Sequence, residues 1–431
     1  MESEQLSIKA KIKAERVWLM IVSRLIITAL LFVSCRTDHL PLEPELTLSV
    51  ADVSCTEVWL KAEGIGSHEF ILERDGSEIE NYSLIDGNII YDDSLQPNTS
   101  YTYRLTRLSG DEKSSEVTVT TMDTTSHDFT WNVYDFGGGS SSILNDIAII
   151  NENDIWAVGS ISTAEGRYNA VHWDGEKWEL KRILYKGGFW DINTIFTFNR
   201  DDIWFEAYMK WNGKSFIELE IPEIMTGFSI NKTWGTNSND FYVVGNDGQI
   251  RHYNGQNWTK IESATELDIQ DIWGSWNEKT GEYEILCVAS TYEEHEAKLF
   301  EIIDGQAKEL ALKGLTYYLD GIWFKSGKKY FIGGSGIKLN NVNIKKNAWI
   351  SYPHGLITSS YIFDIAGNDI NDVAAVGGHG EIIHYNGAGW KSYIDETAFY
   401  GNLTGVDMKG DMIAAAGYTD RSGRILIGKR N

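Results

Sequence analysis

The sequence is poor in cysteine, in proline and in basic residues, and the shortages of cysteine and of basic residues each exclude a class of protein. Three cysteines in 431 residues cannot build a disulfide framework, and none has histidines at zinc-site spacing. A formal net charge of −24 excludes the basic surface that nucleic-acid binding needs. Phosphate-loop, dinucleotide-binding, H-E-x-x-H, nucleophile-elbow and EF-hand motifs are missing. We therefore expect no nucleic acid, metal or cofactor, and we expect Cys55 and Cys287 to be buried thiols.

Glycine and aromatic residues, by contrast, are abundant. There are 41 glycines against five prolines, which is typical of many short strands joined by tight turns. A hydrophobic fraction of 42%, with 12% aromatics, is ample for packed cores. These features predict an all-β protein.

A long apolar run occurs near the N-terminus, from Leu25 to Val33, after a segment with several lysines and arginines. It is too short to span a bilayer and suits the hydrophobic region of a signal peptide. The run ends at Phe32-Val33-Ser34-Cys35, which resembles a bacterial lipoprotein signal, although that family prefers Leu where Phe32 stands. The resemblance implies that residues 1–34 are removed and that Cys35 carries the lipid.

The alternative is an uncleaved membrane anchor of residues 17–34, in which Arg24 would lie at a costly depth. Met20 is a second possible start, because the segment that follows it would be a compact signal by itself. The lipoprotein interpretation places a monomer in the bacterial cell envelope, facing the periplasm or the outside. Its membrane contact would then be the lipid anchor alone.

After a polar linker of residues 35–43, residues 44–122 show short alternating segments separated by turn signals. This pattern predicts a small β-sandwich. The segment Leu95 to Leu105 resembles a fibronectin type III domain, in which a Pro is followed by the tyrosine of the tyrosine corner. The resemblance implies that Tyr101 fills this role. The module is either a spacer that lifts the next domain off the membrane or a partner-binding module itself.

From about residue 143 the chain repeats itself. One signature ends in Val-Gly, and a second contains an Asp-Gly or Asn-Gly turn followed by Trp. The first signature is residues 153–159, 239–245 and 371–377, and the second is residues 172–178, 252–258 and 384–390. Degenerate copies fill the gaps, and a last unit at 410–417 brings the number to seven. A period near 42 residues predicts a seven-bladed β-propeller over residues 128–431.

Local chemistry supports the repeat. Asp-Gly and Asn-Gly favour a type I′ hairpin turn, in which both central residues take positive φ. The recurrent His and Trp are interpreted as packing within the blades, since a catalytic His would not recur in several of them. The last unit lacks a Trp-containing outer strand, and residues 129–134 have the composition to supply it and to close the ring.

The repeat units resemble the Asp-box and photosystem-assembly-factor-like repeats of exported bacterial propellers. The likeness covers roughly 300 residues, from about 128 to 431. It departs from the sialidase Asp-box, because Asp174 and Trp178 are four apart rather than five and the preceding Ser is missing. Sialidase activity is therefore not implied.

Candidate ligand-binding residues lie on loops between units, where exposed aromatic rings can stack on sugars or contact a protein. They are Tyr168, Tyr185, Phe189, Trp190, Phe399 and Tyr400. We expect a non-catalytic envelope protein that binds a protein or a polysaccharide through these loops.

Two alternatives stay open. One is an assembly factor or scaffold for an envelope complex. The other is a glycan hydrolase or lyase that uses Asp146, Asp271 and Asp364, which begin predicted inner strands. Such an enzyme needs two carboxyl groups with opposed protonation roles.

Overall fold

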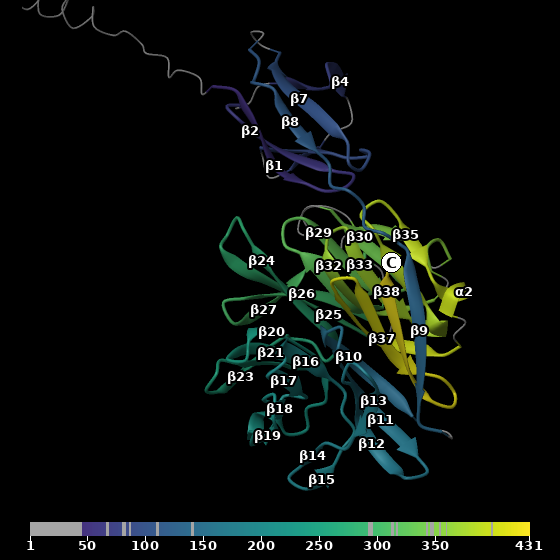
Figure 1. Cartoon of the computed structure of the whole chain (residues 1–431). Helices are drawn as coiled ribbons and strands as arrows, with labels where there is room; N and C mark the ends of the chain where they lie inside the picture. The colour runs from purple at the N-terminus through teal and green to yellow at the C-terminus, as the bar shows by residue number, and fades with distance from the viewer. Residues whose placement is uncertain are drawn as a thin grey trace, which may run out of the picture. The chain divides into compact units, whose positions relative to one another are not determined.

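The computed structural model describes residues 45–431 except for 66–68, 80–82, 86–87, 109–111, 139–141, 292–295, 312–313, 316–317, 342–343, 345–348, 353–354, 359 and 398–399. Nearly all regular elements in this part of the chain are strands (Figure 1). The described helical segments are short: η1 (Glu223–Met225), η2 (Gly378–Gly380) and α2 (Ile394–Thr397). The prediction of an all-β protein is confirmed.

The chain divides into two compact units. Described residues of 1–49, 61–80 and 102–117 form the first, and those of 50–60, 81–101 and 118–431 form the second. Residues 47–120 carry two four-stranded sheets, of order β1–β2–β6–β5 and β4–β3–β7–β8. Their strands are β1 (Thr47–Val53), β2 (Val58–Glu63), β3 (Phe70–Arg74), β4 (Ser77–Ile79), β5 (Ser83–Ile85), β6 (Ile89–Asp92), β7 (Ser100–Arg107) and β8 (Val117–Thr120).

Seven further four-stranded sheets follow one another along the described residues after 128. The first four are β10 (Ile143–Asn151) to β13 (Trp178–Lys181), β16 (Ile195–Asn199) to β19 (Phe216–Glu218), β20 (Ile230–Asn237) to β23 (Trp258–Ile261), and β24 (Ile269–Asn277) to β27 (Gln306–Leu310). The next two are β28 (Leu319–Lys325) to β31 (Ile350–Tyr352) and β32 (Ile362–Asp369) to β35 (Trp390–Ser392). The last has the order β36–β37–β38–β9.

The middle strands of these sheets are β11 (Asp154–Thr163), β12 (Gly166–Trp173), β17 (Asp202–Phe205), β18 (Met209–Trp211), β21 (Asp240–Gly245), β22 (Ile250–Tyr253), β25 (Glu282–Thr291), β26 (Glu296–Ile303), β29 (Lys329–Gly334), β30 (Gly336–Asn340), β33 (Asp372–Gly377) and β34 (Ile382–Tyr385). A small hairpin, β14 (Leu184–Tyr185) and β15 (Gly188–Phe189), lies between the first two sheets along the chain.

The first strands of the seven sheets form a closed circle. Each contacts the first strand of the sheet before and after it, in the order β10, β16, β20, β24, β28, β32, β36 and back to β10. The last sheet takes its outer strand from the other end of the chain. There β9 (Phe129–Phe136) pairs antiparallel with β38 (Gly423–Arg430), next to β37 (Met412–Tyr418) and β36 (Asn402–Lys409). This pairing leaves the last sheet with no unpaired edge on β38.

The faces between neighbouring sheets are apolar, which is why the strands read as near-continuous hydrophobic runs. Residues of β33, for example, are all buried, and they carry the sequence Asp-Val-Ala-Ala-Val-Gly. In another such core, Trp156 and Val158 of β11 pack with Ile203 and Phe205 of β17. Burial of this surface from water is the main stabilisation of the ring.

The recurrent His is a packing residue, as predicted. In three sheets the imidazole on the third strand hydrogen-bonds the aspartate that begins the second strand. These pairs are His172 with Asp154 at 2.9 Å, His252 with Asp240 at 2.7 Å and His384 with Asp372 at 2.8 Å. The ring of His172 also stacks on Trp156, with centroids 4.0 Å apart. Each pair thus joins two strands of one sheet.

The turn prediction is right at one place in the repeats and wrong at four. Asp304 and Gly305 both have positive φ, 51° and 71°, as type I′ requires. At the turns that begin with Asp174, Asn212, Asn254 and Asn386, only the glycine has positive φ. There the side-chain oxygen instead accepts the backbone N–H groups two and three residues later. These side-chain bonds replace the second positive φ as the means of closing the turn.

A pair of histidines connects the closing sheet to the sheet before it. Nδ1 of His127, just before β9, lies 2.8 Å from Nδ1 of His384, whose other nitrogen bonds Asp372. Arg430 of β38 also pairs with Asp372. The Tyr393 hydroxyl donates to the carbonyl of His127 at 2.7 Å. Because a hydrogen bond between two ring nitrogens needs one donor and one acceptor, the two Nδ1 atoms carry one proton between them, and the two imidazoles cannot both be doubly protonated.

Candidate functional site

The glycine that ends the first sequence signature produces a distortion at the start of the inner strand. Opposite it, the first strand carries one extra residue, a β-bulge, in six of the seven sheets. A Cβ at Gly159, Gly245 or Gly377 would overlap a backbone carbonyl oxygen of that strand. Glycine is therefore required for the close approach at these positions. In the sheet of β24, Ala289 stands at the equivalent position.

The bulged residues line a cavity at this end of the circle of inner strands. It has a volume of about 470 Å³, and its lining is mostly polar. Bulged residues in the lining include Asn145, Asn231, Gln270, Phe363 and Thr404. We call this cavity the mouth. A bulge turns one extra side chain out of the sheet, so the mouth follows directly from the repeated glycine.

Carboxylates clamp neighbouring inner strands together. One oxygen of each accepts the N–H of the next residue, and the other accepts an N–H from the next sheet. The four pairs across sheets are Asp146 with Ile195 (3.0 Å), Asp271 with Ile322 (2.7 Å), Asp364 with Val406 (2.9 Å) and Asp407 with Ile149 (2.7 Å). Hydrogen bonds from N–H groups to a buried carboxylate are among the stronger ones in proteins.

Lys232 extends across the circle. It stands on β20 where other sheets have a clamp aspartate, and its Nζ donates to Oδ2 of Asp364 on β32 at 2.9 Å. Its distance to Oδ1 of Asp146 on β10 is 3.7 Å. Since β20 and β32 are not neighbours in the circle, this side chain joins opposite sides of the ring. The ammonium offsets the repulsion among the clamp carboxylates.

Burial changes the protonation of these groups. It raises the pKa of Asp146 to about 6, although the nearby ammonium opposes the shift. It raises the pKa of Glu206, which accepts the N–H of Asn193 at 2.5 Å, to about 7. The pKa of Lys232 is lowered by burial but raised more by the surrounding carboxylates, so the ammonium keeps its proton. The mouth therefore carries less negative charge at neutral pH than its number of carboxyl groups indicates.

These contacts bear on the enzymatic alternative. Both carboxyl oxygens of Asp146, Asp271 and Asp364 accept hydrogen bonds from backbone N–H groups, and one of the three also binds Lys232. A glycan hydrolase needs one carboxyl group positioned to protonate the leaving group and one free to attack or activate water. The three aspartates therefore connect neighbouring inner strands, which is a structural role.

Three strongly exposed hydrophobic side chains lie on links between sheets. Of the large hydrophobic residues in the described part of the chain, the three most exposed are Tyr400 (88%), Leu356 (68%) and Trp190 (62%). Each lies on a segment that joins the outer strand of one sheet to the inner strand of the next. Such segments lead to the bulged end of the inner strands. None of the three lines the mouth itself, and Leu356 lines another pocket together with Tyr385, Ala388 and Gly389. The three residues share their place on these links. We call them the rim. Large apolar side chains left in water commonly mark a binding surface.

The predicted ligand-binding residues have different environments. Trp190 and Tyr400 belong to the rim. Tyr168 and Phe189 are half-buried and flank the guanidinium of Arg182. Phe399 lies outside the described residues. Leu356 was missed, because sequence reasoning selected aromatic residues and this link carries a leucine.

For Tyr185 the prediction is corrected. Its ring is buried, with 8% exposed, in the core between the first two sheets, and its hydroxyl donates to the carbonyl of Leu219 at 2.9 Å. Tyr185 therefore serves packing. A two-residue strand turns it inward while its neighbours Leu184 and Lys186 stay in water.

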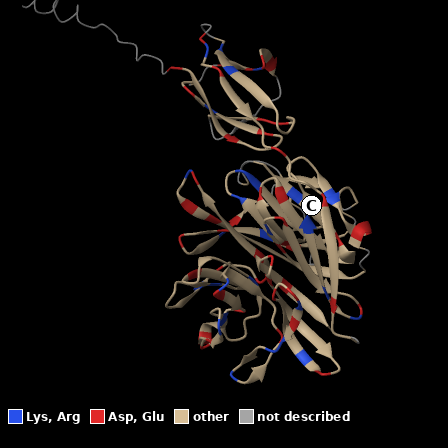
Figure 2. Cartoon of the chain, in the orientation of Figure 1, with Lys and Arg blue, Asp and Glu red and all other residues tan. Residues whose placement is uncertain are grey.

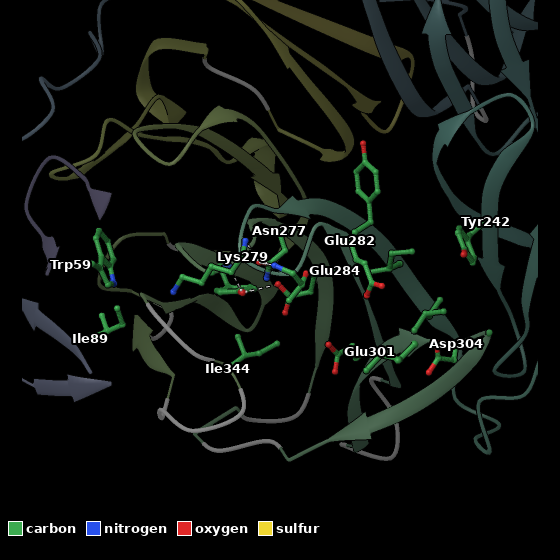
Figure 3. Close-up of a pocket in the computed structure, with 18 residues that line it drawn as sticks. Trp59, Ile89, Tyr242, Asn277, Lys279, Glu282, Glu284, Glu301, Asp304 and Ile344 are labelled. Carbon is green, nitrogen blue, oxygen red and sulfur yellow. Dashed lines mark hydrogen bonds between the residues drawn. The ribbon is translucent and has the colours of Figure 1, made fainter. Parts of the chain in front are cut away.

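Another pocket lies beside the turn that joins β24 to β25 (Figure 3). Glu282, Glu284, Glu301 and Asp304 are labelled along it. Glu284 accepts a hydrogen bond from the Tyr330 hydroxyl at 2.8 Å and so takes part in packing. In this view of the chain, positions of Asp and Glu are spread over many strands and loops (Figure 2).

Among the described residues, no helix has the length and apolarity to cross a membrane. In the same part of the chain, His, Cys, Asp and Glu side chains form no cluster of three suited to a metal ion. Cys55 and Cys287 are buried free thiols, as expected. Burial raises the pKa of Cys55 to about 11, so this thiol stays protonated. Cys35 lies outside the described residues.

Solved structures resemble the chain in fold. YCF48 bound to D1 peptide is 16% identical with a TM-score of 0.53, and the match covers 72% of this chain and 97% of that one. YCF48 from Cyanidioschyzon merolae is 14% identical with a TM-score of 0.50, covering 69% and 98%. No protein-family model and no curated protein sequence matches the chain. Together with the circle of inner strands, the structural likeness shows that the chain contains a β-propeller, which confirms that prediction.

Proposed function

We propose that the protein is a non-catalytic, lipid-anchored component of a bacterial cell envelope that binds a protein partner through the rim of its propeller. The observation that carries this proposal is the position of the three most exposed large hydrophobic residues. Trp190, Leu356 and Tyr400 all lie on links that join the outer strand of one sheet to the inner strand of the next. Large apolar side chains exposed to water are typical anchors of protein interfaces.

Other parts of the proposal rest on narrower observations. The seven four-stranded sheets are proposed to be the seven blades of the propeller. In the N-terminal module, the backbone N–H of Gln96 donates to the Tyr101 hydroxyl at 2.9 Å, which supports a fibronectin type III-like domain. The anchor at Cys35, after removal of residues 1–34, is supported by the sequence pattern Phe-Val-Ser-Cys alone.

A scaffold or assembly role is a special case of protein binding and uses the same rim. One neighbour in fold is a propeller bound to a peptide, which is compatible with such a role. Polysaccharide recognition is less well supported, because Leu356 offers a sugar no aromatic face for stacking.

Site-specific photo-crosslinking in the native host tests the binding face. A benzoylphenylalanine is placed at position 190, 356 or 400, and at position 276 as a control. Trp276 is also exposed (46%) but lies at the opposite end of its inner strand. We expect a discrete protein adduct at the three rim positions and not at the control. Equal adducts at position 276, or no protein adduct at the rim, would contradict the proposal. A high-mass smear removed by glycosidases would favour polysaccharide.

The anchor is tested separately with Cys35→Ser. We expect the variant to lose labelling by a clickable palmitate analogue and to leave the membrane fraction. Retention of the label would show that the lipid is attached elsewhere.

A further inference from the structure

Two loops of the first sheet bring a pair of arginines to the rim. The start of β12 carries Arg167 and Tyr168, and the segment around the β14–β15 hairpin carries Arg182, Phe189 and Asp191. Figure 1 labels these strands. In the hairpin turn, Lys186 and Gly187 have φ values of 49° and 74°, so this short connection is a fixed type I′ turn. The charged groups are therefore held on ordered backbone.

Arg167 already has a carboxylate partner. Its Nη2 donates to both oxygens of Asp191, at 2.7 and 3.0 Å, and to Oγ of Ser160 at 3.2 Å. Its guanidinium also lies 5.2 Å from the centre of the Phe189 ring. This arginine is occupied within the loops.

Arg182 is held in the same way but has no carboxylate partner. Its Nε donates to the carbonyl of Arg167 at 3.0 Å. Its guanidinium carbon lies 5.5 Å from the centre of the Phe189 ring and 5.9 Å from that of Tyr168. The side chain is exposed, and no carboxylate of the described residues pairs with it. Gly166 leaves it room, since a Cβ there would lie 3.1 Å from Nη2.

This arrangement presents two terminal amino groups of a positioned guanidinium to solvent. A planar guanidinium with two free N–H groups matches a carboxylate in a bidentate pair. Because the Nε bond and the two rings already restrict the side chain, a ligand loses little additional side-chain entropy when it binds. In a chain with 62 acidic and 38 basic residues, an exposed arginine left unpaired is an exception.

The neighbouring surface is apolar. Trp190 is 62% exposed and Leu184 is 42% exposed, and both belong to the same link as Arg182. The Trp190 indole folds back over the hairpin, where a Cβ at Gly188 would lie 3.0 Å from its Nε1. A positioned arginine beside an exposed tryptophan is the residue combination that dominates protein interfaces.

We propose that Arg182 binds a carboxylate of the partner protein, with an apolar partner side chain packed on Trp190 and Leu184. The partner segment therefore carries Asp or Glu beside a large apolar residue. Asp191 and Glu165 stand in the same two loops, and they repel a doubly charged phosphate more strongly than a singly charged carboxylate. This assignment rests on the proposed function and specifies the chemistry of its partner.

The test uses the full chain and a dense array of acetylated, amidated tetrapeptides, Ala-X-Z-Ala, in which X and Z cover all residue pairs. We expect peptides with Asp or Glu beside Trp, Phe, Leu or Ile to be retained, and their Asn and Gln counterparts to be lost. Arg182→Glu is expected to weaken this retention about tenfold or more, and Arg182→Lys by less. Arg421→Glu, at an 87% exposed arginine on another loop, is the charge-matched control.

Equal retention of acidic and amide peptides would overturn the assignment, and so would equal losses with Arg182→Glu and Arg421→Glu. Failure of the array to retain any peptide would also overturn it. Thermal unfolding checks that each variant is folded. The crosslinking experiment separates the two proposals. If rim adducts persist in Arg182→Glu at wild-type yield, the proposal of protein binding is retained and the proposed role of Arg182 is rejected. If rim adducts are absent from the wild type, the proposed function itself fails.

Discussion

Two buried polar clusters connect the sheets of the ring. One consists mainly of carboxyl groups and the other of imidazoles. At the mouth, aspartates accept N–H groups from the next inner strand, and Lys232 spans the circle between them. Between the closing sheet and the sheet before it, His127 and His384 share a proton, and His384 also bonds Asp372. In both places burial favours the neutral form. It raises the pKa of the carboxyl groups and lowers the pKa of the imidazoles.

The difference predicts opposite responses to pH. A buried carboxyl group with a raised pKa retains a proton that the unfolded chain releases, so stability falls as pH rises. A buried imidazole with a lowered pKa lacks a proton that the unfolded chain binds, so stability falls as pH drops. The carboxyl groups cost stability as pH rises from about 4 to 7, and the imidazoles cost stability as pH falls from about 6.5 to 4, so the two effects act over overlapping intervals and offset each other there.

The largest loss of stability is expected from a substitution among the buried carboxylates at the mouth. Asp364→Ala leaves the Lys232 ammonium and the Val406 N–H without their partner, and removing one member of a buried ion pair costs about 3–5 kcal/mol. Urea unfolding at pH 7 measures the loss. Asp420→Ala, at an 83% exposed aspartate, is the control and is expected to change stability by less than about 0.5 kcal/mol. A loss below about 1 kcal/mol for Asp364→Ala would show that the clamps are dispensable.

Glu206→Gln tests the predicted loss of stability as pH rises. Native Glu206 keeps its proton up to about pH 7, whereas the unfolded chain releases it near pH 4.5. The native state therefore binds more protons in this interval, and its stability decreases as pH rises, by up to roughly 3 kcal/mol. The variant, which can still accept the N–H of Asn193, is expected to flatten this decrease. Urea midpoints between pH 5 and 8 are the measurement, and an unchanged slope would refute the assignment.

His127→Gln tests the predicted loss of stability as pH falls. Burial and the adjacent His384 ring lower the pKa of His127 to about 4, so the unfolded chain takes up a proton below pH 6.5 that the native pair resists. Stability is therefore lost as pH falls from 6.5 towards 4. Because the ring is partly exposed, we expect the substitution to reduce this loss by only about 1 kcal/mol. Imidazole nitrogen NMR shifts give the titration directly, and a midpoint near 6.5 for His127 would contradict the shared proton.

The smallest effect on stability is expected at the rim. Trp190→Ala removes a side chain that is already 62% exposed, so unfolding is expected to shift by less than about 0.5 kcal/mol. The same change is expected to reduce crosslinking through position 400 to a neighbouring site on the partner. A large loss of stability would mean that Trp190 serves packing, as Tyr185 does.

The sequence allows prediction of those features that recur along the chain. The repeated signatures, the periodic glycines and the Asp-His positions recur in several of the repeats and are visible without a structure. The propeller and the packing role of the histidines were predicted in this way and are confirmed.

Features that depend on residues distant along the chain could not be predicted. Asp146 meets Ile195, Asp407 meets Ile149, and Lys232 meets Asp364, over separations of 49, 258 and 132 residues. The three aspartates were therefore selected as catalytic candidates, although they connect neighbouring inner strands. The turn prediction failed for a local reason, because the side-chain oxygen of Asp174 closes a longer turn than the Asp-Gly pair indicates.

The bulge opposite the signature glycine has an evolutionary consequence. In the sheets that begin with β10, β24 and β32, the extra residue lies outside the register of the strand, whereas the aspartate after it bonds the next inner strand. A mutation at Asn145, Asn231, Gln270 or Phe363 thus changes the lining of the mouth without touching a clamp. Related proteins can acquire new specificities one sheet at a time, each by a single substitution, while the scaffold stays intact.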